Sequence, residues 1–387
     1  MARSADLFAV FVAKAVRTFC YGFLGILLPI YLSQLGLSAP GIGLAVALTL
    51  VGSAGLTWAV RRPAERYGGR AVLLGLAALN GVSAVLLLLA RRPGLVVLAM
   101  MLGNVAVGGS ETGPFLAVEQ VVVTRAVLAR RVTMALSWYN LLGYLASALG
   151  AAAAGLVAAP RTLFVIFLVG AGVQVLAYAW LPGVRVGARP RPAGPRPSAR
   201  LIRRLAALFA LDSFAGGFTL QALVAYFFYA RYGLTLGSLG AVFLASQLLS
   251  AASLLLAERF ARRAGLLNTM VVSHAVSNVL LMGIAVAPNA GVAIALFLSR
   301  HLLSQMDVPT RQAYVMSIVE DHEREAAASS TTLARNVAQA ATPAVTGWVM
   351  QAVALSAPFL LGGGLKLVYD LLLYVMFRHV KPRAEGA

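Results

Sequence analysis

Ionised side chains interrupt several long apolar blocks of the sequence. Arg17 lies within the block 6–32, and Asp212 lies within the block 202–231. A charge at the centre of a bilayer costs roughly 2.5–3.5 kcal/mol unless it is paired or hydrated. Two interpretations are open. Arg17 and Asp212 pair as a structural bridge, or Arg17, together with Lys14 one helical turn before it on the same face, binds an anionic ligand.

Two other apolar blocks combine an acid with a proline. Glu111 precedes Pro114, and Asp307 precedes Pro309 and Arg311. Because proline lacks a backbone donor, both segments are predicted to bend or break and to act as gates. Acids at low dielectric favour the protonated form, although arginines at the membrane surface could instead hold these acids as ion pairs. The candidate proton-binding acids are Glu111, Asp212 and Asp307.

Other polar side chains within the apolar blocks have more ordinary interpretations. Lys366 and Asp370 are spaced i,i+4 and are predicted to compensate each other as a structural pair. His274 and His301 stand alone in sequence and are predicted to be ordinary packed side chains. The predicted lining of a ligand-binding cavity is Lys14, Arg17, Tyr21, Asp212, Phe218, Tyr226 and Arg335.

The elements that must position these residues are membrane-spanning helices. Of 387 residues, 60% are hydrophobic and 12% are charged, and the mean hydropathy is +0.83. The apolar blocks approach the roughly 20 residues that span a bilayer as a helix. This composition indicates an all-α polytopic membrane protein and excludes soluble enzymes, DNA-binding domains and fibrous proteins. The predicted spans are 6–32, 40–61, 70–90, 94–118, 133–158, 162–182, 202–231, 237–258, 267–287, 290–312, 328–353 and 358–378.

The net charge of +19 reports membrane topology. Arginines gather in every second connection, as at residues 61–70 and 259–263. This is the positive-inside pattern, which predicts that both termini are cytoplasmic and that the chain lies in the cell membrane, plasma or inner. No aromatic-basic module accompanies the charge, so no nucleic-acid partner is expected. Cys20 is the one cysteine, which excludes an internal disulfide and a cysteine metal cluster.

A segment rich in proline and arginine divides the chain. Residues 184–201 are predicted to be a cytoplasmic linker between a bundle of residues 1–183 and a bundle of residues 202–387. The two parts resemble each other: residues 17–23 match 212–218, and residues 64–70 match 257–263. Asn140 and Asn336 also align. Agreement in order and residue type predicts a duplicated six-helix unit.

The connection after the second predicted span carries a family resemblance. Residues 61–70 read RRPAERYGGR, which resembles the loop Gly-x-x-x-Asp-Arg-x-Gly-Arg-Arg of the major facilitator superfamily. Glu65 stands in place of the aspartate, Gly69 in place of an arginine and Arg61 in place of the first glycine. The resemblance implies twelve helices in two pseudo-symmetric six-helix bundles around a central cavity. Its antiporter signature is present in part, as Gly143, Gly150 and Gly155 without the proline.

The same connection is a candidate latch. A carboxylate at a helix end with arginines in reach can form ion pairs that break during a conformational change, although positive-inside anchoring alone would also place arginines there. The candidate gating and latch residues are Glu65, Arg66, Arg70, Glu258, Arg259, Pro114, Pro309 and Arg311.

The resemblance implies a secondary transporter that works by alternating access. No Gly-x-x-x-x-Gly-Lys-Ser/Thr sequence is present, so an ion gradient is expected to supply the energy. The first expectation is proton-coupled efflux of small amphipathic organic compounds. The alternative is transport of an organic or phosphorylated anion bound by cavity Arg and Lys, and a remote alternative is a membrane sensor that does not transport.

The expected partners follow from this function. They are a small-molecule substrate, protons or another ion, and the lipid bilayer, with the chain acting as a monomer. No catalytic residue, cofactor or metal is expected, so the protein is not predicted to be an enzyme.

Overall fold

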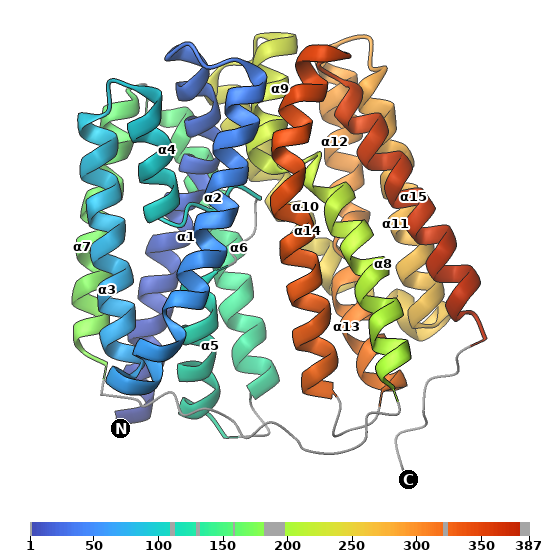
Figure 1. Ribbon diagram of the computed structural model, residues 1–387, viewed down its shortest axis with the longest axis horizontal. Helices are drawn as coiled ribbons and strands as arrows, with labels where there is room; N and C mark the ends of the chain where they lie inside the picture. The colour runs from blue at the N-terminus through green and yellow to red at the C-terminus, as the bar shows by residue number, and fades with distance from the viewer. Residues whose placement is uncertain are drawn as a thin grey trace. The chain divides into compact units, whose positions relative to one another are not determined.

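The computed structural model describes residues 2–108, 113–128, 132–157, 159–181, 198–319 and 324–379. Within these ranges every regular element is an α-helix (Figure 1). Glu111 and most of the predicted linker lie outside the described residues. The predicted all-α membrane fold is confirmed.

The helices form two compact units. Unit 1 contains residues 1–189 and 220–244, and unit 2 contains residues 190–219 and 245–387. The helices of unit 1 are α1 Ala2–Gln34, α2 Ala39–Ala59, α3 Arg61–Leu89, α4 Pro93–Leu102, α5 Pro114–Ala126, α6 Val132–Leu156, α7 Pro160–Ala179, α9 Gln221–Tyr232 and the first part of α10 Leu236–Ala264. Those of unit 2 are α8 Ala199–Gly217, the rest of α10, α11 Leu266–Ala285, α12 Ala290–Ser304, α13 Asp307–Ile318, α14 Arg324–Ala352 and α15 Ala357–Phe377.

The boundary between the units does not follow the predicted linker. Residues 220–244 pack within unit 1, where the Ala222 N–H donates to the Val107 carbonyl over 3.1 Å. α8 begins at Ala199, inside the predicted linker. The division into bundles of residues 1–183 and 202–387 therefore stays a prediction.

Close backbone contact joins the helices at the centre of each unit. In unit 1, α1 packs on α6 and α7, and a Cβ on Gly22 or Gly150 would collide with the carbonyl of Ser147 or Phe19. In unit 2, α8 packs on α14 and α15, and a Cβ on Gly217 would collide with Thr342. Small residues let backbones approach closely, which is how helices associate where lipid removes the hydrophobic driving force.

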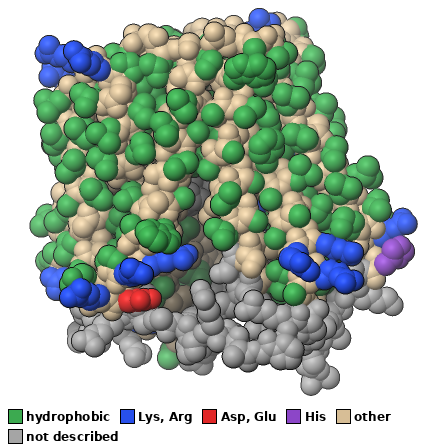
Figure 2. All heavy atoms as spheres, in the orientation of Figure 1, with side chains coloured by type: hydrophobic (Ala, Val, Ile, Leu, Met, Phe, Trp, Pro, Cys, Tyr) green, Lys and Arg blue, Asp and Glu red, His purple; other side chains and the backbone are tan. Residues whose placement is uncertain are grey.

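The outer surface is apolar, as expected for lipid contact. Hydrophobic side chains cover the face in Figure 2, while Lys and Arg lie towards its ends. Leu149 and Leu176 are 61% and 66% exposed. Trp58, Trp138 and Trp180 are also exposed, as interfacial anchors would be.

Four predicted spans are not single apolar helices. Nine described helices are long and apolar enough to cross a membrane. The predicted span 94–118 is broken into α4 and α5, and the span 290–312 is broken into α12 and α13. The span 328–353 corresponds to α14, which is long but too polar to count among the nine. The span 202–231 also has a break, between α8 and α9. These breaks correct the prediction of continuous helices.

The connection at residues 61–70 is helical. α3 starts at Arg61 and kinks at Gly68, where φ is 86° and ψ is 165°. Gly265, between α10 and α11, has almost the same conformation, with φ 81° and ψ 162°. Such a backbone is essentially restricted to glycine. These two glycines are therefore equivalent points of the two sequence halves.

A second pair of glycines fixes the same register. Gly36 and Gly233 both have positive φ, and they are separated by as many residues as Gly68 and Gly265 are. This register aligns Arg62, Ala64 and Arg66 with Arg259, Ala261 and Arg263, in that order. The predicted match of residues 64–70 with 257–263 is therefore wrong by about one helical turn.

Candidate functional site

Unit 1 holds a fully buried ion pair. Arg17 on α1 donates from Nη2 to Glu119 Oε2 over 2.6 Å and from Nη1 to Glu119 Oε1 over 3.1 Å. Tyr178 on α7 donates to Oε1 over 2.6 Å, and Tyr139 on α6 donates to Oε2 over 2.5 Å. We call these four residues the Glu119 cluster. Four hydrogen bonds on one carboxylate satisfy the desolvated charge, and the two-pronged geometry suits a guanidinium.

Local sequence explains how α5 presents Glu119. Pro114 occupies the first helical position, where its fixed φ favours helix initiation and its missing N–H costs nothing. One turn before Glu119, the ring of Phe115 lies 4.2 Å from the Arg17 guanidinium carbon. The aromatic face supplies a further contact for the cation in a dry environment. The predicted gating proline thus positions the carboxylate that neutralises Arg17.

The partner of Arg17 corrects the sequence interpretation. Arg17 was predicted to pair with Asp212 or to bind an anion, whereas its guanidinium is held by Glu119. Sequence reasoning missed Glu119 because the predicted span stopped at residue 118, whereas α5 continues to Ala126. The signal that could have found Glu119 was its place five residues after Pro114 in an apolar run.

The other predicted residues of α1 also have specific contacts. Lys14 is buried, and its Nζ lies 4.4 Å from the centre of the Tyr139 ring. Tyr21 donates to the carbonyl of Gly103 over 2.8 Å. Because Gly103 follows the last residue of α4, this bond satisfies a carbonyl at a helix end.

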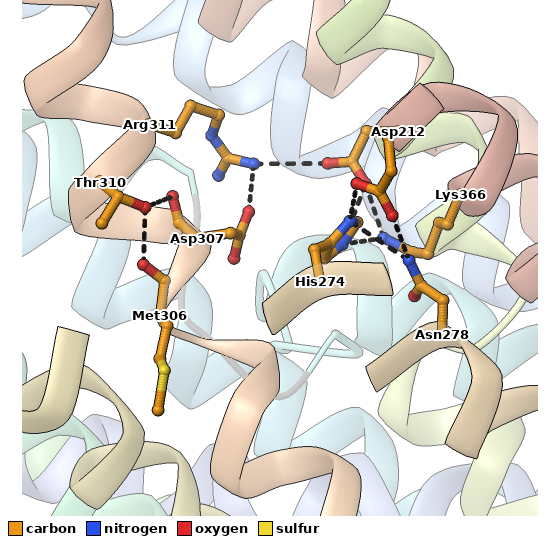
Figure 3. A network of polar contacts seen from close by, with 9 residues as sticks. Asp212, His274, Asn278, Met306, Asp307, Thr310, Arg311 and Lys366 are labelled. Atoms are coloured by element: carbon orange, nitrogen blue, oxygen red, sulfur yellow. Dashed lines mark hydrogen bonds and ion pairs between the residues drawn. The ribbon is translucent and has the colours of Figure 1, made fainter. Parts of the chain in front are cut away.

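Unit 2 holds a larger buried network around Asp212 (Figure 3). Lys366 Nζ on α15 lies 2.7 Å from Asp212 Oδ1, and Arg311 Nη1 on α13 lies 3.4 Å from Asp212 Oδ2. Arg311 also donates to Asp307 over 2.7 Å, one helical turn earlier on α13. We call the set the Asp212 network; its members are Asp212, His274, Asn278, Asp307, Arg311, Lys366 and Asp370.

His274 lies between two carboxylates of this network. Its Nδ1 is 2.7 Å from Asp370 Oδ1, and its Nε2 is 3.6 Å from Asp212 Oδ1. Lys366 Nζ lies 3.4 Å from the same Nε2, and the Tyr369 ring stands perpendicular to the imidazole. The expectation that His274 is an ordinary packed side chain is therefore wrong.

The predicted pair of Lys366 with Asp370 is wrong as well. Lys366 donates to Asp212 on α8, whereas Asp370 accepts from Asn278 over 3.0 Å and contacts His274. Neighbouring helices thus offer better geometry than the i,i+4 spacing along α15. His301 does pack as expected, with its Nδ1 2.7 Å from the Phe297 carbonyl and its ring against Phe297.

The remaining predicted site residues are spread over other parts of the units. Phe218 is buried and packs edge-on against Phe214, while Tyr226 on α9 and Arg335 on α14 are half-buried. Glu65, Arg66 and Arg70 are exposed on α3, and among the described residues no ion pair joins them. Arg259 is exposed. Glu111 and the side chains of Glu258 and Pro309 lie outside what the structure describes. The latch and gating roles stay predictions.

Corresponding helices carry the ion pairs of the two units, with the signs exchanged. In unit 1 the cation is on the first helix and the acid is on the second segment of a broken helix, as Arg17 and Glu119. In unit 2 the acid Asp212 is on the first helix and the cation Arg311 is on the second segment of a broken helix. Each unit thus carries a buried charge pair between corresponding helices, with opposite polarity in the two units.

Comparison with known proteins decides the family. The family model of the Major Facilitator Superfamily matches residues 10–304. The chain belongs to the Major Facilitator Superfamily. An uncharacterized membrane protein of Saccharomyces cerevisiae is 21% identical over 430 residues, which cover 99% of this chain and 96% of that protein.

Solved structures agree with this family in fold. A D-xylose-proton symporter superposes with a TM-score of 0.75 at 12% identity and covers 100% of both chains. A human organic anion transporter superposes with a TM-score of 0.66 at 16% identity, covering 96% of this chain and 100% of its own. This major facilitator is a multi-pass membrane transporter, and its fold implies a small-molecule substrate.

Proposed function

We propose that this transporter uses a proton gradient to drive efflux of small amphipathic organic compounds by alternating access. The observation that carries the proposal is the Asp212 network, in which an imidazole, an ammonium and a guanidinium contact three carboxylates. Buried ionisable groups within spans are expensive and characteristically mark ion pathways and proton relays. A proton gained or lost there changes the net charge of the buried network.

The Glu119 cluster supports placing the coupling in unit 2. Its carboxylate and guanidinium are both fully buried, and two tyrosines and an arginine fill the hydrogen-bonding directions of Glu119. Such a pair is a stable neutral unit, because removing either charge would strand the other. The Asp212 network instead contains an imidazole with alternative partners, so both its neutral and its protonated form have hydrogen-bonding partners there.

Aromatic pairs support an amphipathic substrate. Phe19 and Phe23 on α1 pack edge-on at 5.8 Å, and Phe214 and Phe218 on α8 do so at 5.7 Å. In each pair the second ring is buried and the first is half-buried. A half-buried ring held rigidly by its neighbour offers an apolar contact surface at a low entropic cost.

A second candidate function is transport of an organic or phosphorylated anion. The buried Lys14 and the half-buried Arg335 favour it, since both add positive charge to residues predicted to line the cavity. Arg17, Arg311 and Lys366 contribute less to an anion site, because Glu119, Asp307 and Asp212 hold them in ion pairs.

The test is flux measured in proteoliposomes with an imposed pH gradient. Matched fluorescent compounds that differ in a cationic, neutral or anionic head group would serve as substrates. We expect the gradient to drive cationic and neutral amphipathic compounds, and a protonophore to abolish that flux. Gradient-driven flux of the anionic compounds alone would support the second candidate. A flux whose rate is the same with and without the pH gradient would overturn proton coupling.

A further inference from the structure

A hydrogen bond joins the third and sixth helices of each sequence half. In unit 1, Asn80 Nδ2 on α3 donates to Gln174 Oε1 on α7 over 3.1 Å. In unit 2, Asn278 Nδ2 on α11 donates to Asp370 Oδ2 on α15 over 3.0 Å. All four residues are buried. Asn80 lies 12 residues after the kink at Gly68 and Asn278 lies 13 residues after Gly265, so the two bonds occupy the same part of corresponding helices, one residue apart in register.

Unit 2 differs from unit 1 at this crossing in two side chains. The acceptor is the carboxylate of Asp370 where unit 1 has the amide of Gln174. One turn before the asparagine, unit 2 has His274 where unit 1 has the buried Leu76. Two amides are therefore enough to join these helices. A buried carboxylate and imidazole cost more to desolvate than an amide and a leucine, so packing alone does not account for them.

His274 has two incompatible sets of partners. A neutral imidazole that donates from Nδ1 to Asp370 has a lone pair on Nε2, which can accept from Lys366 at 3.4 Å. A protonated imidazole also carries a hydrogen on Nε2, which repels Lys366 and can be donated to Asp212, 3.6 Å away. The imidazolium and Lys366 would then compete for the same oxygen, Asp212 Oδ1.

We propose that His274 and Asp370 form the proton-binding pair of this transporter, and that protonation of His274 loosens the hold of Lys366 on Asp212. The inference rests on the proposed proton-coupled function and names the residues that perform it. A proton arriving from water binds at Nε2, the imidazole becomes imidazolium, and loss of that proton to water restores the starting state. The switch links α11 and α15 to α8, so each state of His274 favours one set of interhelical contacts.

Several charged and titratable groups surround this pair. Asp212 on α8 contacts both His274 and Lys366, and Tyr369 lies edge-on to His274. α11 packs against α12, α13 and α15, whose charged and titratable side chains are Arg300 and His301 on α12, Asp307, Arg311 and Tyr314 on α13, and Lys366, Tyr369 and Asp370 on α15. Arg335 on α14 adds a further positive charge to unit 2. Asp307 and Arg311 neutralise each other's charge at 2.7 Å. The charged groups in direct contact with His274 are therefore Asp212, Lys366 and Asp370.

Unit 1 itself supplies the design of the test. Asp370→Asn replaces the carboxylate by an amide of the same shape, and His274→Leu installs the side chain that unit 1 has at Leu76. Both variants should fold, because unit 1 is built with that chemistry. The matched control is Gln174→Ala, which removes the corresponding hydrogen bond in unit 1 without touching an ionisable group.

Two readouts in proteoliposomes decide the matter. We expect both unit 2 variants to lose pH-gradient-driven accumulation while retaining substrate exchange without a gradient, and the control to keep its pH profile. Nuclear magnetic resonance of the chain's four histidines should show His274 change protonation when a transported compound is added. If the wild type is proton-driven and Asp370→Asn retains the same pH profile, the inference is overturned and the proposed function stands. If the pH gradient does not drive accumulation by the wild type, the proposed function fails, and the inference fails with it.

Discussion

Several buried charges in the described part of this transporter form ion pairs with a partner on another helix. Arg17 and Glu119 are 102 residues apart in sequence, and Lys366 and Asp212 are 154 residues apart. In a low-dielectric interior, a missing partner leaves an uncompensated charge whose cost exceeds the net value of the pair. The residues that hold these pairs are therefore expected to matter first for folding, and only those with alternative partners for coupling.

Arg17 gives the clearest test at this scale. Arg17→Gln should lower the free energy of unfolding by about 3–5 kcal/mol, because it strands Glu119. The double variant with Glu119→Gln should recover most of that loss, since one tyrosine can still donate to the glutamine oxygen and the other can accept from the glutamine NH2 group. Thermal unfolding of the purified protein measures both. Arg66→Gln, at an exposed position, should stay within about 0.5 kcal/mol of the wild type. Failure of the double variant to recover stability would contradict the pairing.

Helix breaks determine where the helices that carry site residues begin. α5 begins at Pro114, and α13 begins at Asp307, two residues before Pro309. Each break lets a new helix start in mid-block, with its N-terminal N–H groups free for other partners. Kinks of another kind occur at Gly68 and Gly265, where positive φ turns the chain between consecutive spans. Breaks and kinks thus mark corresponding points of the two halves.

The glycine kink can be tested with an internal control. Gly68→Ala forces a side chain into a backbone region that only glycine adopts readily, so it should cost about 1–3 kcal/mol of stability. Gly75 lies seven residues later in the same helix, and a Cβ there meets nothing within 4 Å. Gly75→Ala should therefore be neutral or slightly stabilising. Equal thermal midpoints for the two variants would show that the kink does not need glycine.

At the scale of the whole molecule, charge position sets how the chain sits in the membrane. The arginines of residues 61–70 are exposed at one end of α3, and Arg91 and Arg92 are exposed at the other end. The larger group is expected to be cytoplasmic, because positive charge near span ends is retained on that side. Both termini would then be cytoplasmic.

Cysteine labelling tests this orientation. The one native cysteine, Cys20, is buried, so its background labelling should be low. A membrane-impermeant maleimide should label Arg92→Cys in intact cells and Arg62→Cys only in inverted vesicles. Labelling of the two positions in the opposite order would reverse the proposed orientation.

The sequence by itself determined the class and family of this protein. Blocks of apolar residues about one bilayer thick can satisfy their backbone only as helices, so the all-α membrane fold followed from composition and length. The resemblance at residues 61–70 indicated the family, and the family model confirms it. Most helix positions were also readable, because hydrophobicity along the chain is a local property.

The tertiary structure decided which charges meet. Sequence spacing suggested Lys366 with Asp370, Arg17 with Asp212, and an isolated His274, whereas the structure joins Lys366 to Asp212, Arg17 to Glu119 and His274 to Asp370. Residue types alone cannot settle such choices, since any buried acid would attract any buried base. The choice depends on which helices pack side by side and on the depth at which a break or kink places each side chain.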